Sequence, residues 1–238
     1  EYDIKQAAVP VIISGLEQLQ NSGREQMIDL MEGRLGVAES SMANLLAGGI
    51  YSDGTGSGGK QITGLDAGVS DTPAVGVYGG IDPASWPFWQ NAYESLDLGP
   101  TTVDAAMNDM WASLVRGMDR PNLIVMDNAF WAIYIASLQS QQRFNSSSKA
   151  VRGFPTIAYM DADVVLDGGI GGFAPAGTAY FLNTKYLFWR PHASRNMVPL
   201  SPNKRYAINQ DAEVQILAWA GNLTTSGRQF QGRLNDST

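Results

Sequence analysis

The chain has a single histidine, His192, which lies in the segment Arg190–Arg195. Serine and cysteine hydrolases need a histidine beside their nucleophile, and zinc sites usually combine several ligands of the histidine, cysteine or acidic type. A lone histidine between two arginines offers neither arrangement, and the chain contains no cysteine that could act as a thiol nucleophile. We expect His192 to be a structural or surface residue.

Asp161, Asp163 and the nearby Asp167 form an acidic cluster that could bind Ca²⁺ or act as paired carboxylates. In a strand, Asp161 and Asp163 would point to one face, while the apolar residues that follow would point to the other. This pattern is typical of a solvated strand edge. The spacing of a Ca²⁺-binding loop with its closing glutamate is absent, so we expect no metal here.

The stretch Gly54–Lys60 has the glycine, four residues, glycine and lysine of a phosphate-binding loop. The next residue is Gln61 and not the serine or threonine that would bind Mg²⁺. A phosphate-binding loop also leaves a strand and enters a helix, so that backbone amides face the phosphates. Here a helical pattern precedes the glycines and an extended segment follows them. We therefore expect a flexible turn.

Trp86, Phe88 and Trp89 form a dense aromatic group. Such rings can stack on sugars or on nucleic-acid bases. The alternative, which we favour, is that they anchor a short helix on the core.

Positive charge is concentrated in one region of an otherwise acidic chain, whose formal net charge is −7: Arg190, Arg195, Lys204 and Arg205. These side chains could contact DNA phosphates, but we favour ion pairs with acidic residues of a neighbouring subunit. The negative net charge argues against a sequence-reading nucleic-acid binder, which would normally be basic. We thus expect no catalytic residue, no cofactor-binding residue and no metal ligand, and we expect that the protein is not an enzyme.

The composition is that of a globular protein: 238 residues, of which 44% are hydrophobic. This is enough for one large domain or two closely joined ones. No run of about 18 apolar residues exists that could span a membrane, and we find no signal peptide.

The longest predicted element is a helix over Ser22–Ala47, with Ser22 and Glu25 as a capping box. Gly48–Gly49 is predicted to end it, because glycine readily adopts the left-handed geometry of helix ends. Apolar residues follow helical spacing along one stripe: Ile28, Met31, Leu35, Ala38, Met42 and Leu45.

The other elements are predicted from shorter patterns. Ala7–Gln20 reads as a turn and a short helical or irregular approach to the long helix, and further helices are predicted to start at Thr101 and Asp127. Strands are predicted over nine segments: Glu1–Gln6, Val75–Tyr78, Leu123–Met126, Phe154–Tyr159, Ala162–Asp167, Gly177–Asn183, Tyr186–Trp189, Asp211–Leu223 and Ser226–Leu234.

A long helix that runs into Ser52-Asp53-Gly54-Thr55-Gly56 and then Gly64-Leu65 resembles the major capsid proteins of tailed bacteriophages. The resemblance covers nearly the whole chain in order. It implies an α+β fold, the tailed-phage major capsid fold, with a long spine helix, a peripheral (P) domain and an axial (A) domain. The N-terminal arm of that fold and most of its E-loop are missing from this sequence.

The resemblance also implies a division of the chain. Residues 1–98 would form part of the P domain, with an E-loop remnant and the spine helix. Residues 99–183 would form the A domain. Residues 184–238 would supply the closing P-domain strands, with the last two strands packed against the spine helix.

The function that the resemblance implies is structural. Copies of the chain would assemble into hexamers and pentamers of an icosahedral shell that packages double-stranded DNA without sequence-specific binding. Further partners would be portal, scaffold or decoration proteins, with no membrane partner. The location would be the virion capsid, and the host cytoplasm during assembly. Without the arm, we expect this form to assemble poorly.

Two alternatives remain open. An encapsulin-like shell would have the same fold and would store a cargo enzyme. An acidic glycan-binding or glycan-cleaving protein would use Trp86 and Trp89 with Asp161 and Asp163.

Overall fold

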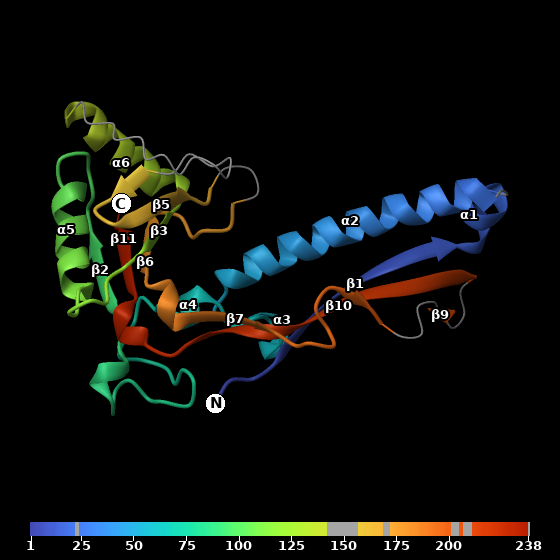
Figure 1. Ribbon diagram of the computed structural model, residues 1–238, viewed down its shortest axis with the longest axis horizontal. Helices are drawn as coiled ribbons and strands as arrows, with labels where there is room; N and C mark the ends of the chain where they lie inside the picture. Colours follow the sequence, from blue (N-terminus) through green and yellow to red (C-terminus); the bar gives the residue numbers. More distant parts are fainter. Residues whose placement is uncertain (22–23, 142–156, 169–171, 201–204, 207–210, 238) are drawn as a thin grey trace.

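The computed structural model describes all 238 residues except 22–23, 142–156, 169–171, 201–204, 207–210 and 238. Figure 1 shows an elongated ribbon of long strands and one long helix, which projects from a body made of a sheet and two helices. The helices are α1 (Gly15–Gln20), α2 (Arg24–Ile50), α3 (Gly56–Gly59), α4 (Leu65–Gly68), α5 (Val103–Leu114) and α6 (Asn128–Gln141).

The strands form two sheets. The five strands of the ribbon are β1 (Lys5–Ser14), β7 (Leu187–Pro191), β8 (Val198–Pro199), β9 (Arg205–Tyr206) and β10 (Ala212–Thr225). The six strands of the body are β2 (Ala92–Leu96), β3 (Leu123–Met126), β4 (Ile157–Tyr159), β5 (Ala162–Leu166), β6 (Thr178–Leu182) and β11 (Gly232–Asp236).

The ribbon is organised by the antiparallel pair β1 and β10, whose register runs from Lys5 opposite Gly221 to Ser14 opposite Ala212. On β1, the buried side chains of Ala7, Val11 and Ile13 alternate with exposed ones. This alternation marks a strand with one packed face. Figure 1 shows α2 lying along the ribbon.

The prediction for the N-terminal segment was wrong in two respects. A strand was expected over Glu1–Gln6, but β1 starts at Lys5 and extends through Ala7–Ser14, where a turn was expected. Pro10 lies in the middle of β1, although proline usually argues against a central strand. Here it is accommodated because β1 lies at the edge of its sheet.

Helix α2 confirms the long predicted helix but ends later than expected. Gly48 and Gly49 lie inside the helix, which continues to Ile50. A Cβ atom on Gly49 would lie 2.8 Å from the Cδ1 atom of Ile62. Glycine is therefore needed there for close packing, and not to end the helix.

The predicted apolar stripe of α2 is only partly buried. Ala38 and Met42 are buried, whereas Leu45 is 46% exposed, and Leu46 packs on the ribbon core instead. The predicted capping residue Ser22 and the side chains of Ile28 and Met31 lie outside the part that the structure describes.

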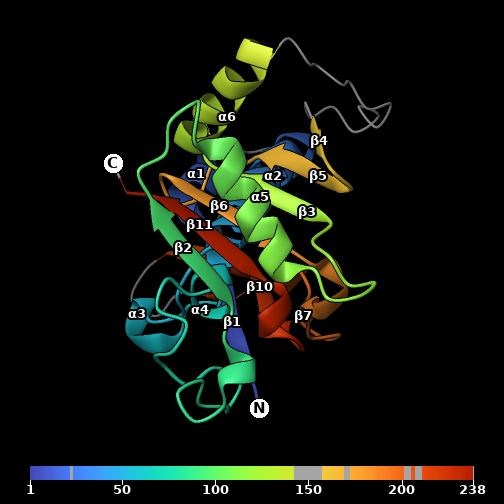
Figure 2. The ribbon, with the colours of Figure 1, turned by 90° about the vertical axis from the view of Figure 1, so that its left-hand side faces the viewer.

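The body contains a mixed sheet of strand order β2-β11-β6-β3-β5-β4. Its larger core lies between the sheet and α5 and α6, and includes Ile124 and Phe181. Figure 2 shows α5 in front of this sheet and α6 at its upper end. Tyr180 and Val125 pack in a second cluster with Leu65 and Leu223. The sheet is thus apolar on both faces.

Several predictions for the body are confirmed. Strand β3 has the predicted bounds, and α5 starts at Val103, within the predicted helix start. The Asp127 carboxylate accepts hydrogen bonds from the backbone amides of Ala129 and Phe130, 3.0 Å each, so it caps α6 as its position suggested. Residues 154–156 of a predicted strand lie outside the described part, and β4 occupies the rest of it.

Two further predictions were wrong. Val75–Tyr78 is a loop with one isolated bridge between Tyr78 and Ile81, and not a strand. The closing strand was expected beside the long helix, but β11 pairs with β2 and β6 in the body sheet. Its position depends on partners more than 50 residues away, which the local pattern does not reveal. The division at residues 98 and 183 stays a prediction.

Candidate functional site

The turn that follows α2 does not have the geometry of a phosphate-binding loop. Asp53 and Thr63 form an antiparallel bridge, so the segment closes on itself after leaving the helix. Within α3, Ser57 and Gly58 have left-handed φ angles of 54° and 68°. The Asp53 carboxylate accepts hydrogen bonds from the backbone and hydroxyl of Thr55, and these bonds lower its pKa. The stretch is a turn, as expected from the sequence.

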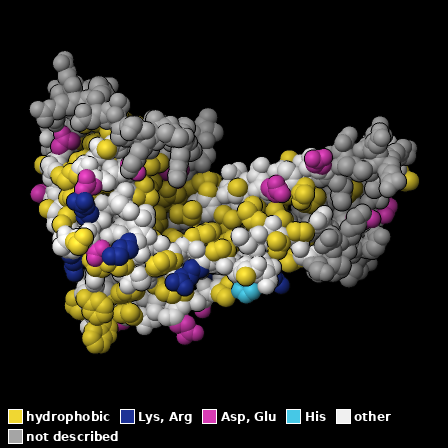
Figure 3. All heavy atoms as spheres, in the orientation of Figure 1, with side chains coloured by type: hydrophobic (Ala, Val, Ile, Leu, Met, Phe, Trp, Pro, Cys, Tyr) yellow, Lys and Arg dark blue, Asp and Glu magenta, His cyan; other side chains and the backbone are white. Residues whose placement is uncertain are grey.

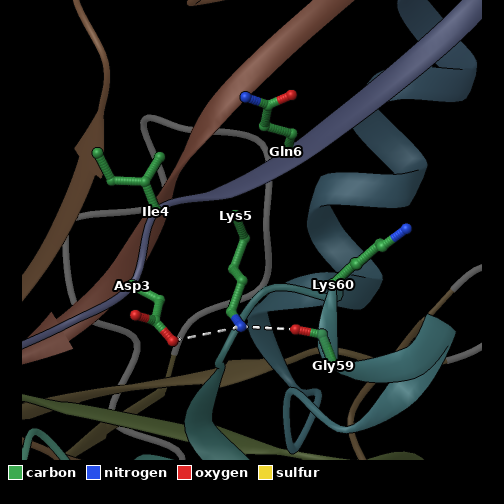
Figure 4. Close-up of a pocket in the computed structure, with 6 residues that line it drawn as sticks. All are labelled: Asp3, Ile4, Lys5, Gln6, Gly59 and Lys60. Carbon is green, nitrogen blue, oxygen red and sulfur yellow. Dashed lines mark hydrogen bonds and ion pairs between the residues drawn. The ribbon is translucent and has the colours of Figure 1, made fainter.

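Lys5 ties this turn to the ribbon, a role that its place in the sequence does not indicate. Figure 4 shows its ammonium group between Asp3 and Gly59. The Lys5 Nζ atom donates to the carbonyl oxygen of Gly59 at 2.6 Å and lies 3.9 Å from the Asp3 carboxylate. Together with Ile4, Gln6 and Lys60, these residues line a cavity of about 520 Å³. Nothing in the sequence marks the contact, because Lys5 and Gly59 are 54 residues apart.

A second recess lies beside the first, where β1, the last turns of α2 and the glycine-rich turn meet. We call it the ribbon recess; it has a volume of about 460 Å³. Its apolar wall is formed by Ala7, Ala8, Leu45 and Ile62, and Lys60 lies at its polar side. Among the described residues, the Lys60 ammonium has no hydrogen-bond or ion-pair partner. The recess can therefore receive an apolar group accompanied by a negative charge.

Two buried polar side chains near the C-terminal end of the chain hold the segments that follow α2 in place. The buried Asn222 side chain accepts a hydrogen bond from the Thr63 amide and donates one to the Asp3 carbonyl oxygen, 2.9 Å each. It thereby joins β10 to the turn and to the start of the chain. The buried Arg228 side chain donates from Nε to the Gly68 carbonyl oxygen at 2.7 Å. Burial lowers the pKa of Arg228.

The aromatic group splits into one buried and two exposed rings. Trp89 is 7% exposed and anchors the 3₁₀ helix Pro87–Trp89 on the core, as favoured from the sequence. Trp86 and Phe88 are 58% and 55% exposed, so anchoring was the wrong role for them. Figure 3 shows hydrophobic side chains gathered at the lower left end, over the segment that is teal to green in Figure 1. A buried Trp89 cannot offer its face to a sugar.

His192 is exposed at the end of β7, where its Nδ1 atom accepts a hydrogen bond from the Ser194 amide at 3.2 Å. This is the surface position that the sequence suggested. Of the basic group, Arg190 is exposed and lies over the Phe188 ring, at 5.0 Å from its centroid, and Arg195 contacts Gln6. The side chains of Lys204 and Arg205 lie outside the described part.

The acidic residues do not form one cluster. Asp161 lies in the turn between β4 and β5, not in a strand, and pairs with Arg120 at 2.6 Å. Asp167 follows β5, and burial together with the Asp167 carboxylate raises the pKa of Tyr51. Among the described residues, no three histidine, cysteine or acidic side chains lie close enough together to hold a metal ion. Within the same part of the chain, no helix has the length and apolar character needed to cross a membrane.

Comparison with known proteins relates the chain to others through its structure alone. No family profile matches the sequence, and no curated protein matches it. The structure is similar to a capsid protein of cyanophage A-1(L), with a TM-score of 0.64 and 13% identity over 98% of this chain and 77% of that one.

Two further structures extend this similarity. A capsid protein of an empty GTA particle gives a TM-score of 0.61 and 14% identity, over 99% of this chain and 74% of that one. The SrpI encapsulin of Synechococcus elongatus gives a TM-score of 0.58 and 10% identity, over 99% of this chain and 74% of that one. The chain therefore has the tailed-phage major capsid fold, which phage capsid proteins share with encapsulin shells.

Proposed function

We propose that this protein is a structural subunit that assembles with its own copies into a closed shell. The observation that carries the proposal is that proteins with this fold over nearly the whole chain are subunits of phage, GTA and encapsulin particles. The elongated form supports it, because a ribbon that projects from the body leaves much of its surface free for contacts between copies (Figure 1).

The finer proposal is a phage-type capsid. In it, copies form hexamers and pentamers of an icosahedral shell around double-stranded DNA, within a virion capsid that assembles in the host cytoplasm. Many modest contacts, repeated by symmetry, would hold such a shell together. The formal net charge of −7 suits a lining that does not bind DNA tightly. Portal, scaffold or decoration proteins would be further partners, and no catalytic step is required.

Electron microscopy of the protein expressed from its complete gene tests this proposal. We expect closed particles of uniform diameter. A preparation that stays monomeric at every concentration and salt condition would contradict a shell function.

An encapsulin-like shell is the second candidate, and one observation favours it: the SrpI encapsulin has the same fold at a TM-score of 0.58. The contents of purified particles distinguish the two shells. Nuclease-protected double-stranded DNA supports the capsid, whereas a co-purifying enzyme with no nucleic acid supports the encapsulin-like shell.

The geometry disfavours two of the four residues on which the glycan-directed alternative depends. The ring of Trp89 is buried, and the Asp161 carboxylate is held in an ion pair with Arg120.

A further inference from the structure

We propose that the exposed rings of Trp86 and Phe88 insert into the ribbon recess of a second copy of this chain. We call these two rings the aromatic knob. The proposal rests on the shell function proposed above and assigns one of its contacts to named residues. The knob lies at one end of the body, and the recess lies where β1, α2 and the glycine-rich turn meet.

The knob is exposed although the segment that carries it is held rigidly. The Trp86 and Phe88 rings pack edge to face, with their centroids 6.1 Å apart. Just before them, the Asp82 carboxylate accepts hydrogen bonds from the Ala84 amide and the Ser85 hydroxyl. Behind them, Trp89 fixes the backbone. Two large rings that stay exposed on an ordered segment are typical of an interface anchor, because ordering such a segment at binding costs little entropy.

The recess has the size and lining to receive the knob. Its volume of about 460 Å³ falls in the range of roughly 300–1,000 Å³ found for sites that bury organic groups. Ala7, Ala8, Leu45 and Ile62 offer apolar atoms to the rings. Leu45 is 46% exposed in the single chain and would lose that exposure on contact. Trp86 and Phe88 do not line the recess of their own chain, so a second copy must supply them.

Charge favours the same pairing. Residues 61–115 contain no lysine or arginine and seven acidic residues: Asp66, Asp71, Asp82, Glu94, Asp97, Asp104 and Asp109. The knob lies within this acidic segment, and Asp82 precedes Trp86 by four residues. The recess carries Lys60, whose ammonium has no partner among the described residues. The Lys60 ammonium of the recess and the Asp82 carboxylate beside the knob carry opposite charges, which favours correct encounter.

The contact joins two different surfaces, so it is a head-to-tail contact. Such contacts close into rings when the rotation between neighbours permits, and otherwise form open chains. This is the type of contact that a ring-shaped capsomer requires. A symmetric pairing of two knobs would instead stop at a dimer.

The chain has no cysteine, so disulfide trapping tests the contact on a clean background. Ala84→Cys, at an exposed position next to the knob, is placed in one preparation and Ala8→Cys in another, each with a tag of different mass, and the mixture is oxidised gently. We expect a disulfide-linked heterodimer whose joined peptides are identified by mass spectrometry, and a ladder of higher species from the doubly substituted chain. Glu39→Cys, at an exposed position of α2, is the matched control for Ala8→Cys. It should give at least tenfold less product with Ala84→Cys.

Sedimentation velocity supplies an independent measurement. Trp86→Ala and Phe88→Ala change exposed residues, so thermal melting should show that both variants fold. We expect each to weaken self-association at least tenfold, and Lys60→Glu to weaken it less. Equal trapping with Glu39→Cys, or unchanged association in both aromatic variants, would overturn the proposal. Saturable binding of an oligosaccharide that is lost in Trp86→Ala, with association intact, would also overturn it and assign the knob to a glycan.

Failure of this inference can be told apart from failure of the shell function. Uniform closed particles that form equally well with Trp86→Ala and Phe88→Ala would leave the shell function standing and refute the knob. Trapping at Ala8 in a protein that forms open chains and never closed particles would support the knob and contradict the shell.

Discussion

The indole Nε1 of Trp89 donates a hydrogen bond to the backbone carbonyl oxygen of Tyr78 at 2.9 Å. The ring is buried, and the bond ties the aromatic segment to the loop before it. Because Trp86 and Phe88 precede this anchor and remain exposed, the same short segment combines a stabilising residue with a free apolar surface.

Replacing the two tryptophans should therefore have different effects. Trp89→Ala removes a buried ring and a hydrogen bond, so we expect a loss of about 3–5 kcal/mol in the free energy of unfolding. Trp86→Ala removes an exposed ring, and we expect a change within about 1 kcal/mol. Urea unfolding followed by circular dichroism measures both. Similar losses in the two variants would show that Trp86 is also a core residue.

Helix α2 offers a second matched pair. The Met42 side chain is fully buried against the ribbon, whereas Leu45, three residues later, is 46% exposed. Met42→Ala should lower the free energy of unfolding by about 2–5 kcal/mol, because it leaves a cavity between the helix and the sheet. Leu45→Ala should cost about 1 kcal/mol or less. Urea unfolding measures both variants. Equal losses in the free energy of unfolding would mean that α2 packs on the ribbon in another orientation.

Two substitutions of Asp127 separate the effect of its charge on the cap of α6 from the effect of its hydrogen bonds. Asp127→Ala removes the acceptor for the Ala129 and Phe130 amides, and we expect a loss of about 1 kcal/mol, within the range of 0.5–2 kcal/mol for such caps. Asp127→Asn keeps an acceptor oxygen and should retain most of the stability. If both variants lose the same amount, the charge matters and not the hydrogen bonds.

The ion pair between Lys185 and Asp119 predicts a pH dependence. Hydrogen bonds from Lys185 and then Tyr186 lower the pKa of Asp119 from 3.8, and the same pair raises the pKa of Lys185. Between the lowered pKa and pH 3.8, the Asp119 carboxyl is therefore protonated in most unfolded chains and ionised in most folded ones. The contribution of Asp119 is fully present above this pH and is lost as the pH falls through the lowered pKa. In Asp119→Asn, we expect Tm to fall less between pH 5 and pH 3 than in the parent protein. An equal fall in Tm in the two proteins would show that the ion pair does not stabilise the fold in solution.

The elements that the sequence predicted well are those decided by neighbouring residues. Strand β3 and the cap at Asp127 follow from a short apolar run and a side chain next to its helix. Elements decided by distant partners were missed. Strand β1 continues past Pro10 because β10 pairs with it, and Gly49 lies within α2 because Ile62 packs against it.

The same limit applies to the candidate site. The context of Gly54–Lys60 predicted a turn and not a phosphate-binding loop, but Lys5 and Asn222, which hold that turn, lie 54 and more than 150 residues away. The different exposure of Trp86 and Trp89 could not be predicted either, since the local sequence does not show which of two neighbouring tryptophans is buried. Only the folded chain separates the ring that stabilises the core from the ring that faces solvent.

The shell function is tested most directly by cryo-electron microscopy of particles purified after expression of the complete gene. The account predicts a closed, symmetric shell whose density accommodates the ribbon and body of each subunit, with the aromatic knob of one subunit against the ribbon recess of the next. A protein that remains a monomer, or whose assemblies never close, would contradict it.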